Sequence, residues 1–194
     1  MIMCTYKKIC ITNRKLVKEP YFERIEKLAA SKEIDMIILR EKDLPETEYE
    51  KLAGEVLKIC RKYDQLCMLH SFTDVARRLD HPYIHLPMQL FLHMTQEERK
   101  YFKKIGVSTH SLEEALTVQE MGASYITASH IFATACKAGL EPKGLEFLKE
   151  ITRAMKIDVY ALGGIHPDNM EQCIEAGADG VCMMSEYMNG DLQL

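Results

Sequence analysis

The chain lacks the sequence features of secreted, disulfide-stapled and membrane proteins. Its seven cysteines include no C-x-x-C pair and no other pair with metal-ligand spacing, and they are spread through apolar segments. This scattered, odd number indicates reduced, mostly buried thiols rather than a disulfide framework or a zinc site. The N-terminus has no apolar secretory segment, and no apolar run reaches the length of a membrane span. We therefore expect a cytoplasmic protein without membrane contact.

The chain also lacks an excess of positive charge. It has 25 Lys and Arg against 29 Asp and Glu, a net charge of -4 and a pI near 6.0. This balance argues against a general nucleic-acid binder, which usually has a basic face. No linker or low-complexity stretch divides the 194 residues. We therefore expect one domain, residues 1–194, long enough to bury a core.

What the chain does have is a regular alternation of short apolar runs and amphipathic helical segments. The predicted strands are Lys8–Thr12, Asp35–Arg40, Leu66–His70, Tyr83–Leu86, Ile105–His110, Ser124–His130, Asp158–Gly163 and Gly180–Ser185. Such alternation predicts a parallel sheet covered by helices. Eight units favour a closed (β/α)8 TIM barrel over an open doubly wound sheet, and no G-x-G-x-x-G follows the first strand. The last helix must be rudimentary or missing, because only nine residues follow Ser185.

Local signals mark where the helices begin and end. Three pairs match a capping box: Thr47/Glu50, Thr95/Glu98 and Ser111/Glu114. Pro167 suits a helix start, and Gly177 suits a helix stop. A weak internal repeat aligns residues 120–130 with residues 175–185. Both copies predict a helix end, a Gly-Ala turn and a buried strand.

Histidines gather at the predicted carboxyl ends of the strands, where the active sites of such barrels lie. His130 lies at the end of a buried strand, and an imidazole there can act as acid or base near neutral pH. A core histidine bonded to a backbone carbonyl is the alternative. His110 and Ser108 also lie at a strand end, and we predict His130, His110 and Ser108 as catalytic residues. His85 lies in mid-strand and is assigned to packing, while His81, His93 and His166 are assigned to loops or caps.

Other strand-end residues suit the binding of an anionic small molecule. Gly163 and Gly164 bring backbone N–H groups close to an anion before a helix that begins near Pro167, with Ser185 opposite, so these three residues are predicted to bind phosphate. The alternative to phosphate binding is that Gly163 and Gly164 only form the turn between the strand and the next helix. The predicted substrate-binding residues are Arg40, Lys42, His70, Thr134 and Lys137.

Two of these cations have plainer alternatives. Arg40 can hold a carboxylate or phosphate with two hydrogen bonds, or it can pair with Asp43 or Glu41 at the rim. Lys42 can simply be solvated. No carboxylate falls cleanly at a strand end, and no His, Asp or Glu cluster has metal-ligand spacing. We therefore predict no metal held by the protein.

Several motifs together resemble the thiamine phosphate synthase and TenI-type thiazole tautomerase family over nearly the whole chain. They are Leu39-Arg40-Glu41-Lys42-Asp43, residues 106–115, the loop from His130 to Lys137, Ala161-Leu162-Gly163-Gly164-Ile165, and residues 176–185. The resemblance implies a (β/α)8 barrel and one of two activities in thiamine biosynthesis. A synthase joins a pyrimidine methyl pyrophosphate to thiazole phosphate with Mg2+ held by aspartates. A tautomerase aromatises a carboxylated dihydrothiazole phosphate.

The departures from the family pattern favour the tautomerase branch. The synthase pattern has Gln at the place of Ile38, Asn-Asp at the place of His70-Ser71, and an Asp where this chain reads residues 87–90. The tautomerase branch has a histidine at the place of His130 and a Cys-Lys-x-Gly-Leu-Glu run similar to residues 136–141. The resemblance thus implies an isomerase without a cofactor, in which His130 shifts a proton.

The expected partner is a phosphorylated thiazole, and no nucleic acid is expected. The sequence leaves the oligomeric state open, with a homodimer as one alternative. A divergent thiamine phosphate synthase, which would use Mg2+, is kept as the first alternative. A non-catalytic binder or regulator of thiazole phosphate is the second.

Overall fold

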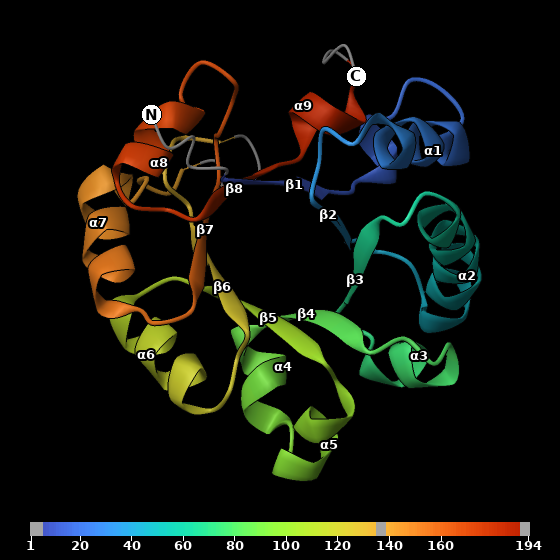
Figure 1. Ribbon diagram of the computed structural model, residues 1–194, viewed down its shortest axis with the longest axis horizontal. Coiled ribbons are helices and arrows are strands. Elements are labelled where there is room, and N and C mark those ends of the chain that lie inside the picture. Colours follow the sequence, from blue (N-terminus) through green and yellow to red (C-terminus); the bar gives the residue numbers. More distant parts are fainter. Residues whose placement is uncertain (1–5, 135–138, 191–194) are drawn as a thin grey trace.

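Eight parallel strands form a closed barrel in the part of the chain that the computed structural model describes, residues 6–134 and 139–190 (Figure 1). The strands are β1 Lys7–Ile11, β2 Met36–Leu39, β3 Leu66–His70, β4 Tyr83–Pro87, β5 Lys104–Thr109, β6 Tyr125–Ser129, β7 Asp158–Leu162 and β8 Gly180–Met183. Each strand pairs in parallel with the next, and β8 closes on β1. The predicted fold class, a (β/α)8 TIM barrel, is confirmed.

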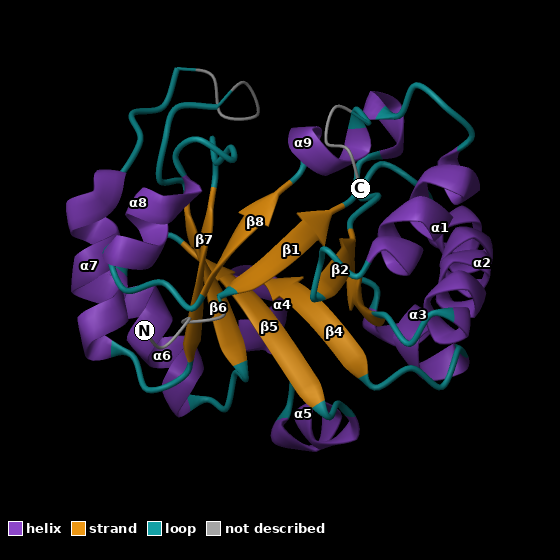
Figure 2. Ribbon diagram, turned by 45° about the horizontal axis from the view of Figure 1, so that its top comes forward, coloured by secondary structure: helices purple, strands orange, loops and turns teal. Residues whose placement is uncertain are grey.

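A ring of helices surrounds the strands (Figure 2). The helices are η1 Arg14–Leu16, α1 Tyr21–Ser31, α2 Glu46–Lys62, α3 Thr73–Arg78, α4 Met88–His93, α5 Gln96–Tyr101, α6 Leu112–Glu120, α7 Gly144–Ala154, α8 Met170–Glu175 and α9 Ser185–Met188. Among the residues described, no helix combines the length and apolar character that crossing a membrane requires.

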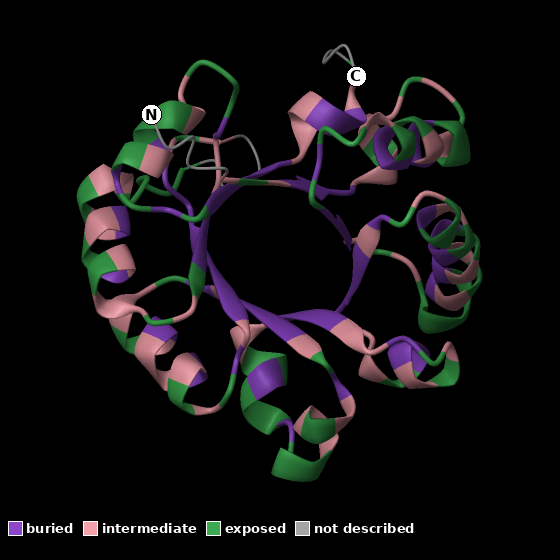
Figure 3. Cartoon of the chain, viewed as in Figure 1, coloured by how far each residue is buried: buried purple, intermediate pink, exposed green. Residues whose placement is uncertain are grey.

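The core has two layers because successive strand residues face opposite sides. Ile9 and Ile11 point into the barrel with Tyr125 and Tyr160, whereas Cys10 packs outward against the helices. Both faces of each strand are therefore covered, and the strands are almost entirely buried in Figure 3. The five described cysteines are buried and free, as predicted; Cys4 and Cys136 lie outside the described residues.

The last helix is rudimentary, as predicted. α9 has four residues and lies beside α1 (Figure 1). The buried Arg24 of α1 donates from Nε to the Tyr187 carbonyl of α9 at 2.5 Å. A charged donor thus satisfies a carbonyl at the end of this short helix.

The predicted helix boundaries are partly right. The Thr95/Glu98 capping box is present in full, and Gly177 ends α8 with φ +94°. The Thr47/Glu50 box is wrong, since α2 already begins at Glu46 after Pro45. Pro167 is not a first helical residue either, because α8 begins only at Met170.

The Ser111/Glu114 box is only half formed. The Ser111 hydroxyl accepts from the Glu114 N–H, but the Glu114 carboxylate accepts from the His110 N–H instead of the N-cap backbone. The internal repeat is confirmed: α6 and α8 both end just before a glycine with positive φ, at Gly122 and Gly177, and a buried strand follows each.

Candidate active site

A cavity of about 530 Å³ lies at the carboxyl ends of the strands. Its walls come from segments spread along the whole chain, which the closed barrel brings to one end. The predicted site residues that line it are Arg40, Lys42, His70, Ser108, His130, Thr134, Gly163, Gly164 and Ser185. Apolar side chains, among them Ile11, Ile38 and Leu162, form the rest. The cavity therefore combines a few polar groups with an apolar wall, as small-molecule sites do.

His130 is a buried base candidate in a segment that backbone hydrogen bonds hold in place. It is 4% exposed, and its Nε2 atom has no hydrogen-bond partner among residues 6–134 and 139–190. The segment after it is fixed to β7 by two backbone hydrogen bonds, from Ile131 to Leu162 and from Phe132 to Gly163, each 3.0 Å. His130 lines the cavity, and an imidazole nitrogen that lacks a partner among the described residues is a candidate acid or base toward a bound ligand.

Gly163 allows His130 to lie where it does. A Cβ atom on residue 163 would be 2.3 Å from the His130 Cβ, and Gly163 has φ +106°. Gly164 meets the same loop, since its Cβ would be 2.3 Å from the Ala133 carbonyl oxygen. The two glycines thus serve close packing of the His130 loop as well as lining the cavity.

Two further imidazoles stand side by side inside the barrel. The rings of His70 and His85 are stacked with centroids 5.7 Å apart. His70 Nδ1 lies 2.7 Å from Ser71 Oγ, and both ring nitrogens of His85 are hydrogen-bonded, to the Tyr125 hydroxyl and to Ser108 Oγ. The assignment of His85 to packing is therefore incomplete: the residue is buried, as packing requires, but it also lines the cavity.

Burial and positive charge keep both imidazoles neutral. Desolvation, with a smaller contribution from the nearby Arg40 charge, lowers the pKa of His85 to about 3. The pKa of His70 is also well below its ordinary value, first because of burial and then because of His85 and Arg40. At neutral pH these two side chains are hydrogen-bonding groups rather than cations.

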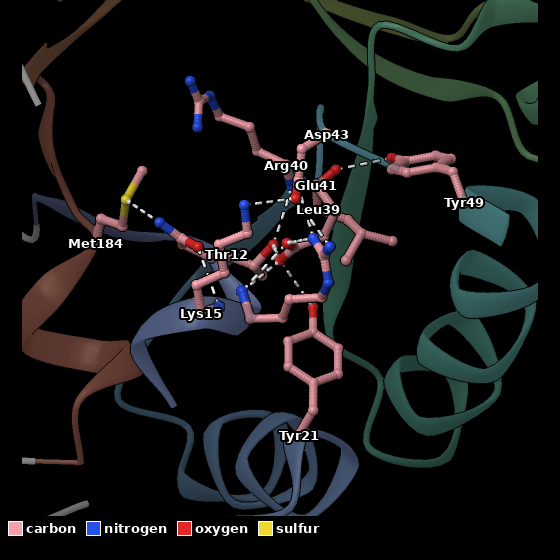
Figure 4. A network of polar contacts seen from close by, with 11 residues as sticks. Thr12, Lys15, Tyr21, Leu39, Arg40, Glu41, Asp43, Tyr49 and Met184 are labelled. Carbon is pink, nitrogen blue, oxygen red and sulfur yellow. Dashed lines mark hydrogen bonds and ion pairs between the residues drawn. The ribbon is translucent and has the colours of Figure 1, made fainter. Parts of the chain in front are cut away.

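The cations Arg40 and Lys42 line the cavity, and neither side chain has an ion pair with the described residues. The alternative that Arg40 pairs with Asp43 or Glu41 is wrong. Asp43 binds Arg14 at 2.6 Å and Lys15 at 2.7 Å, and Glu41 binds Arg14 at 3.1 Å. In Figure 4 the Arg40 side chain extends away from this network.

A buried carboxylate organises the loops that carry these cations (Figure 4). Glu41 is 2% exposed and accepts from the Thr12 hydroxyl at 2.8 Å, the Arg14 N–H at 3.0 Å and the Tyr21 hydroxyl at 3.3 Å. Thr12 Oγ1 in turn accepts from the Arg40 N–H at 2.9 Å. The expectation that no carboxylate lies at a strand end is thus corrected, although Glu41 does not line the cavity.

The phosphate-binding candidates lie along one part of the cavity wall. Gly163, Gly164 and Ser185 all line it. The Glu186 carboxylate is held by His166, with Oε1 2.6 Å from Nδ1. The helix expected to begin near Pro167, behind the two glycines, begins only at Met170.

Two predicted residues stand apart from this group. His110 is exposed, does not line the cavity, and lies with Nδ1 3.0 Å from the Ser129 carbonyl oxygen. Lys137 lies outside the described residues. Thr134, which precedes Lys137 in the sequence, does line the cavity.

The cavity does not fit a Mg2+ ion held by protein carboxylates. No Asp or Glu is among the described residues that line it. Nor do the described residues include a group of three or more His, Cys, Asp or Glu side chains placed to bind a metal. Mg2+ prefers carboxylate and phosphate oxygens, which this lining does not supply.

Residues 9–187 match the family model described as thiamine monophosphate synthase. The chain belongs to this family. It is 37% identical over 178 residues to a protein of Aquifex aeolicus named putative thiamine-phosphate synthase 2, covering 92% of this chain and 95% of that one. It is 30% identical to a thiamine-phosphate synthase of Caldanaerobacter subterraneus, with 94% and 86% covered.

A solved structure shows the same architecture. The thiamine phosphate pyrophosphorylase of Pyrococcus furiosus superposes with a TM-score of 0.80 at 31% identity, covering 96% of this chain and 89% of that one. The predicted family, and with it a role in thiamine biosynthesis, is confirmed. The names of these relatives favour the synthase alternative over the tautomerase interpretation, and none of the three is named a tautomerase.

Proposed function

We propose that this member of the family is a metal-independent isomerase that resembles thiazole tautomerase. One observation carries the proposal: the buried Nε2 of His130 has no hydrogen-bond partner among the described residues, and the described lining of the cavity contains imidazoles and cations but no carboxylate. Such a lining suits proton transfer on a bound anion.

The substrate is a carboxylated dihydrothiazole phosphate. His130 Nε2 removes a proton from a ring carbon, and a proton is delivered to the exocyclic side-chain carbon, so the ring becomes aromatic and no atom is lost. Arg40 binds the carboxylate, while Gly163, Gly164 and Ser185 hold the phosphate. Aromaticity supplies the driving force, and one positioned base accelerates such a step by roughly 10²- to 10⁴-fold.

The second candidate is a thiamine phosphate synthase, which the names of the relatives favour. It would couple hydroxymethylpyrimidine pyrophosphate to thiazole phosphate and release pyrophosphate. The substrate pyrophosphate would have to supply the oxygen ligands of Mg2+ that the cavity lining lacks.

The test follows aromatisation of the carboxylated dihydrothiazole phosphate by ultraviolet absorbance in EDTA, with and without protein. We expect clear acceleration over the spontaneous rate. His130→Gln should lose at least 100-fold of the rate while product binding stays within about twofold. An unchanged rate in His130→Gln would remove His130 from the mechanism.

Two histidine variants complete the design. His93→Gln changes an exposed histidine on α4 and serves as the matched control. His110→Gln tests the other predicted catalytic histidine, which we expect to matter little because it does not line the cavity. Saturable binding of thiazole phosphate without either reaction would instead indicate a non-catalytic binder.

A further inference from the structure

A chain of side-chain hydrogen bonds runs through the inside of the barrel and ends at the cavity. The Tyr125 hydroxyl lies 3.0 Å from His85 Nδ1, and His85 Nε2 lies 2.8 Å from Ser108 Oγ. The Thr127 hydroxyl donates to Ser108 Oγ at 3.1 Å. These residues belong to β4, β5 and β6, and the strand register places Ser108 beside Thr127. Because His85 and Ser108 line the cavity, the chain connects the buried Tyr125 to the space where a ligand binds.

The burial of Tyr125 fixes the direction of each proton in this chain. Tyr125 is 0% exposed, and within the described residues its hydroxyl bonds only to His85 Nδ1. If Nδ1–H donated to it, the hydroxyl proton would be buried without an acceptor, which is unfavourable. Tyr125 therefore donates to Nδ1, and the neutral His85 carries its proton on Nε2. Ser108 Oγ then accepts from both His85 and Thr127, so its own proton points into the cavity.

Gly106 of β5 provides the space that this arrangement needs. A Cβ atom there would lie 2.1 Å from Tyr125 Cζ and 2.5 Å from His85 Nδ1. Glycine weakens a strand interior and often marks a close approach of other groups. At residue 106 the approaching group is the hydrogen bond between Tyr125 and His85.

The donor at Ser108 shares the cavity with a cation. Arg40 lines the same cavity and has no ion pair with the described residues. It is also close enough to His85 for its charge to act on that ring. A hydroxyl donor and a guanidinium that face one space suit a carboxylate, which has several acceptor sites.

We propose that Ser108, oriented by His85 and Tyr125, donates a hydrogen bond to the ligand carboxylate beside Arg40 and so selects carboxylated over decarboxylated thiazole phosphates. The identity of the ligand rests on the proposed function. Ser108 is the residue that touches the ligand, and His85 and Tyr125 are positioning residues. Without Tyr125 the His85 ring can take the other tautomer, draw the Ser108 proton to Nε2, and remove the donor from the cavity.

The test compares equilibrium binding of two aromatic ligands, the carboxylated thiazole phosphate product and its decarboxylated analogue, by calorimetry. We expect the wild type to prefer the carboxylated ligand. Tyr125→Phe and Ser108→Ala should each lose about tenfold of this preference, while the affinity for the decarboxylated ligand stays within about twofold. Tyr160→Phe is the matched control, because it removes a hydroxyl from a ring 5.0 Å from Tyr125 that bonds Asp158 instead.

Variants of His85 separate positioning from packing. His85→Gln keeps a side-chain donor near the place of Nε2 and should retain most of the preference, whereas His85→Leu should lose it. In ¹⁵N spectra of histidine-labelled protein, the His85 signals, identified by their absence in His85→Gln, should show the Nε2–H tautomer in the wild type. An Nδ1–H tautomer would overturn the proposal.

The outcomes distinguish this inference from the proposed function. Because the binding comparison needs no turnover, the predicted pattern in a protein that does not accelerate aromatisation would support the hydrogen-bond chain and reject the isomerase. Acceleration together with an unchanged preference in Tyr125→Phe would overturn the chain and leave the isomerase standing. A wild type with no preference for the carboxylated ligand would also overturn the chain.

Discussion

Glu41 and Asp43 both bind Arg14, but Glu41 is buried and Asp43 is exposed. Neutralising Glu41 should therefore lower the stability of the protein far more than neutralising Asp43. The Glu41 side chain is 1% exposed, whereas that of Asp43 is 39% exposed, and both accept from Arg14. Glu41→Gln removes a buried charge and one acceptor oxygen while Thr12 and Tyr21 still direct hydroxyl groups at the site. Asp43→Asn changes a pair that water already solvates.

The expected loss follows from the contacts of Glu41. Removing one partner of a buried, hydrogen-bonded ion pair costs about 3 to 5 kcal/mol, and the 28% exposure of the Arg14 side chain places this pair at the lower end. Asp43 continues to pair with Arg14, and glutamine keeps one acceptor oxygen, so we expect a loss of about 3 kcal/mol for Glu41→Gln. For a chain of this size that corresponds to a fall in Tm of roughly 6 to 12 °C. Asp43→Asn should leave the Tm close to that of the wild type, because exposed ion pairs contribute little.

The assay is urea denaturation followed by circular dichroism, together with KM in the aromatisation reaction. Because Thr12 links Glu41 to the backbone of Arg40, Glu41→Gln should also raise KM, whereas Asp43→Asn should not. Equal losses of stability in the two variants would refute the view that the buried carboxylate holds the two loops together.

Three further predictions address the cavity. In Gly163→Ala the new Cβ would meet His130, at a residue with φ +106°. This variant should lose roughly 1 to 3 kcal/mol of stability and at least tenfold in rate. Gly54→Ala is the control and should lose neither, because no atom lies within 4 Å of its new Cβ. Arg40→Lys should raise KM about tenfold at nearly constant kcat if the guanidinium binds the substrate with two hydrogen bonds, and a change confined to kcat would contradict this. The pKa of His85 is lowered from 6.5 to about 3, so its contribution to stability is present above pH 6.5 and is lost as the pH falls toward 3. Chemical denaturation should therefore show about 2 kcal/mol less stability at pH 5 than at pH 7 from this residue, a difference that His85→Gln should lack.

Much of the barrel could be predicted from the sequence because each strand is an apolar run with turn residues on both sides. The predicted strands all exist, and their ends shift by only one or two residues. The helix starts at Thr47 and Pro167 were wrong because a residue that suits a cap does not decide where the first helical turn closes. Near Pro167, the Asn169 side chain accepts from the His166 N–H at 2.8 Å and stabilises a turn before α8 begins.

The candidate site was harder to predict because strands buried on both faces carry no alternation that shows which residues point inward. His85 lies in the middle of β4, yet the register pairs it with His70 at the end of β3. The stagger of strands in a barrel brings such residues to one level, which cannot be read from a residue's place within its own strand. His110 shows the opposite case, since it follows β5 directly and yet remains exposed. Successive residues of an extended segment face opposite sides. Because Arg40 and Lys42 line the cavity, Glu41 between them faces away from it, and this spacing was the available signal in the sequence.

The most direct test of the central claim runs both family reactions on one protein preparation. Aromatisation of the carboxylated dihydrothiazole phosphate is measured in EDTA, and pyrophosphate release from hydroxymethylpyrimidine pyrophosphate with thiazole phosphate is measured in Mg2+. A cavity with an available imidazole and no lining carboxylate predicts accelerated aromatisation and no pyrophosphate release. Pyrophosphate release that depends on Mg2+, with aromatisation at the spontaneous rate, would contradict the account and identify a synthase.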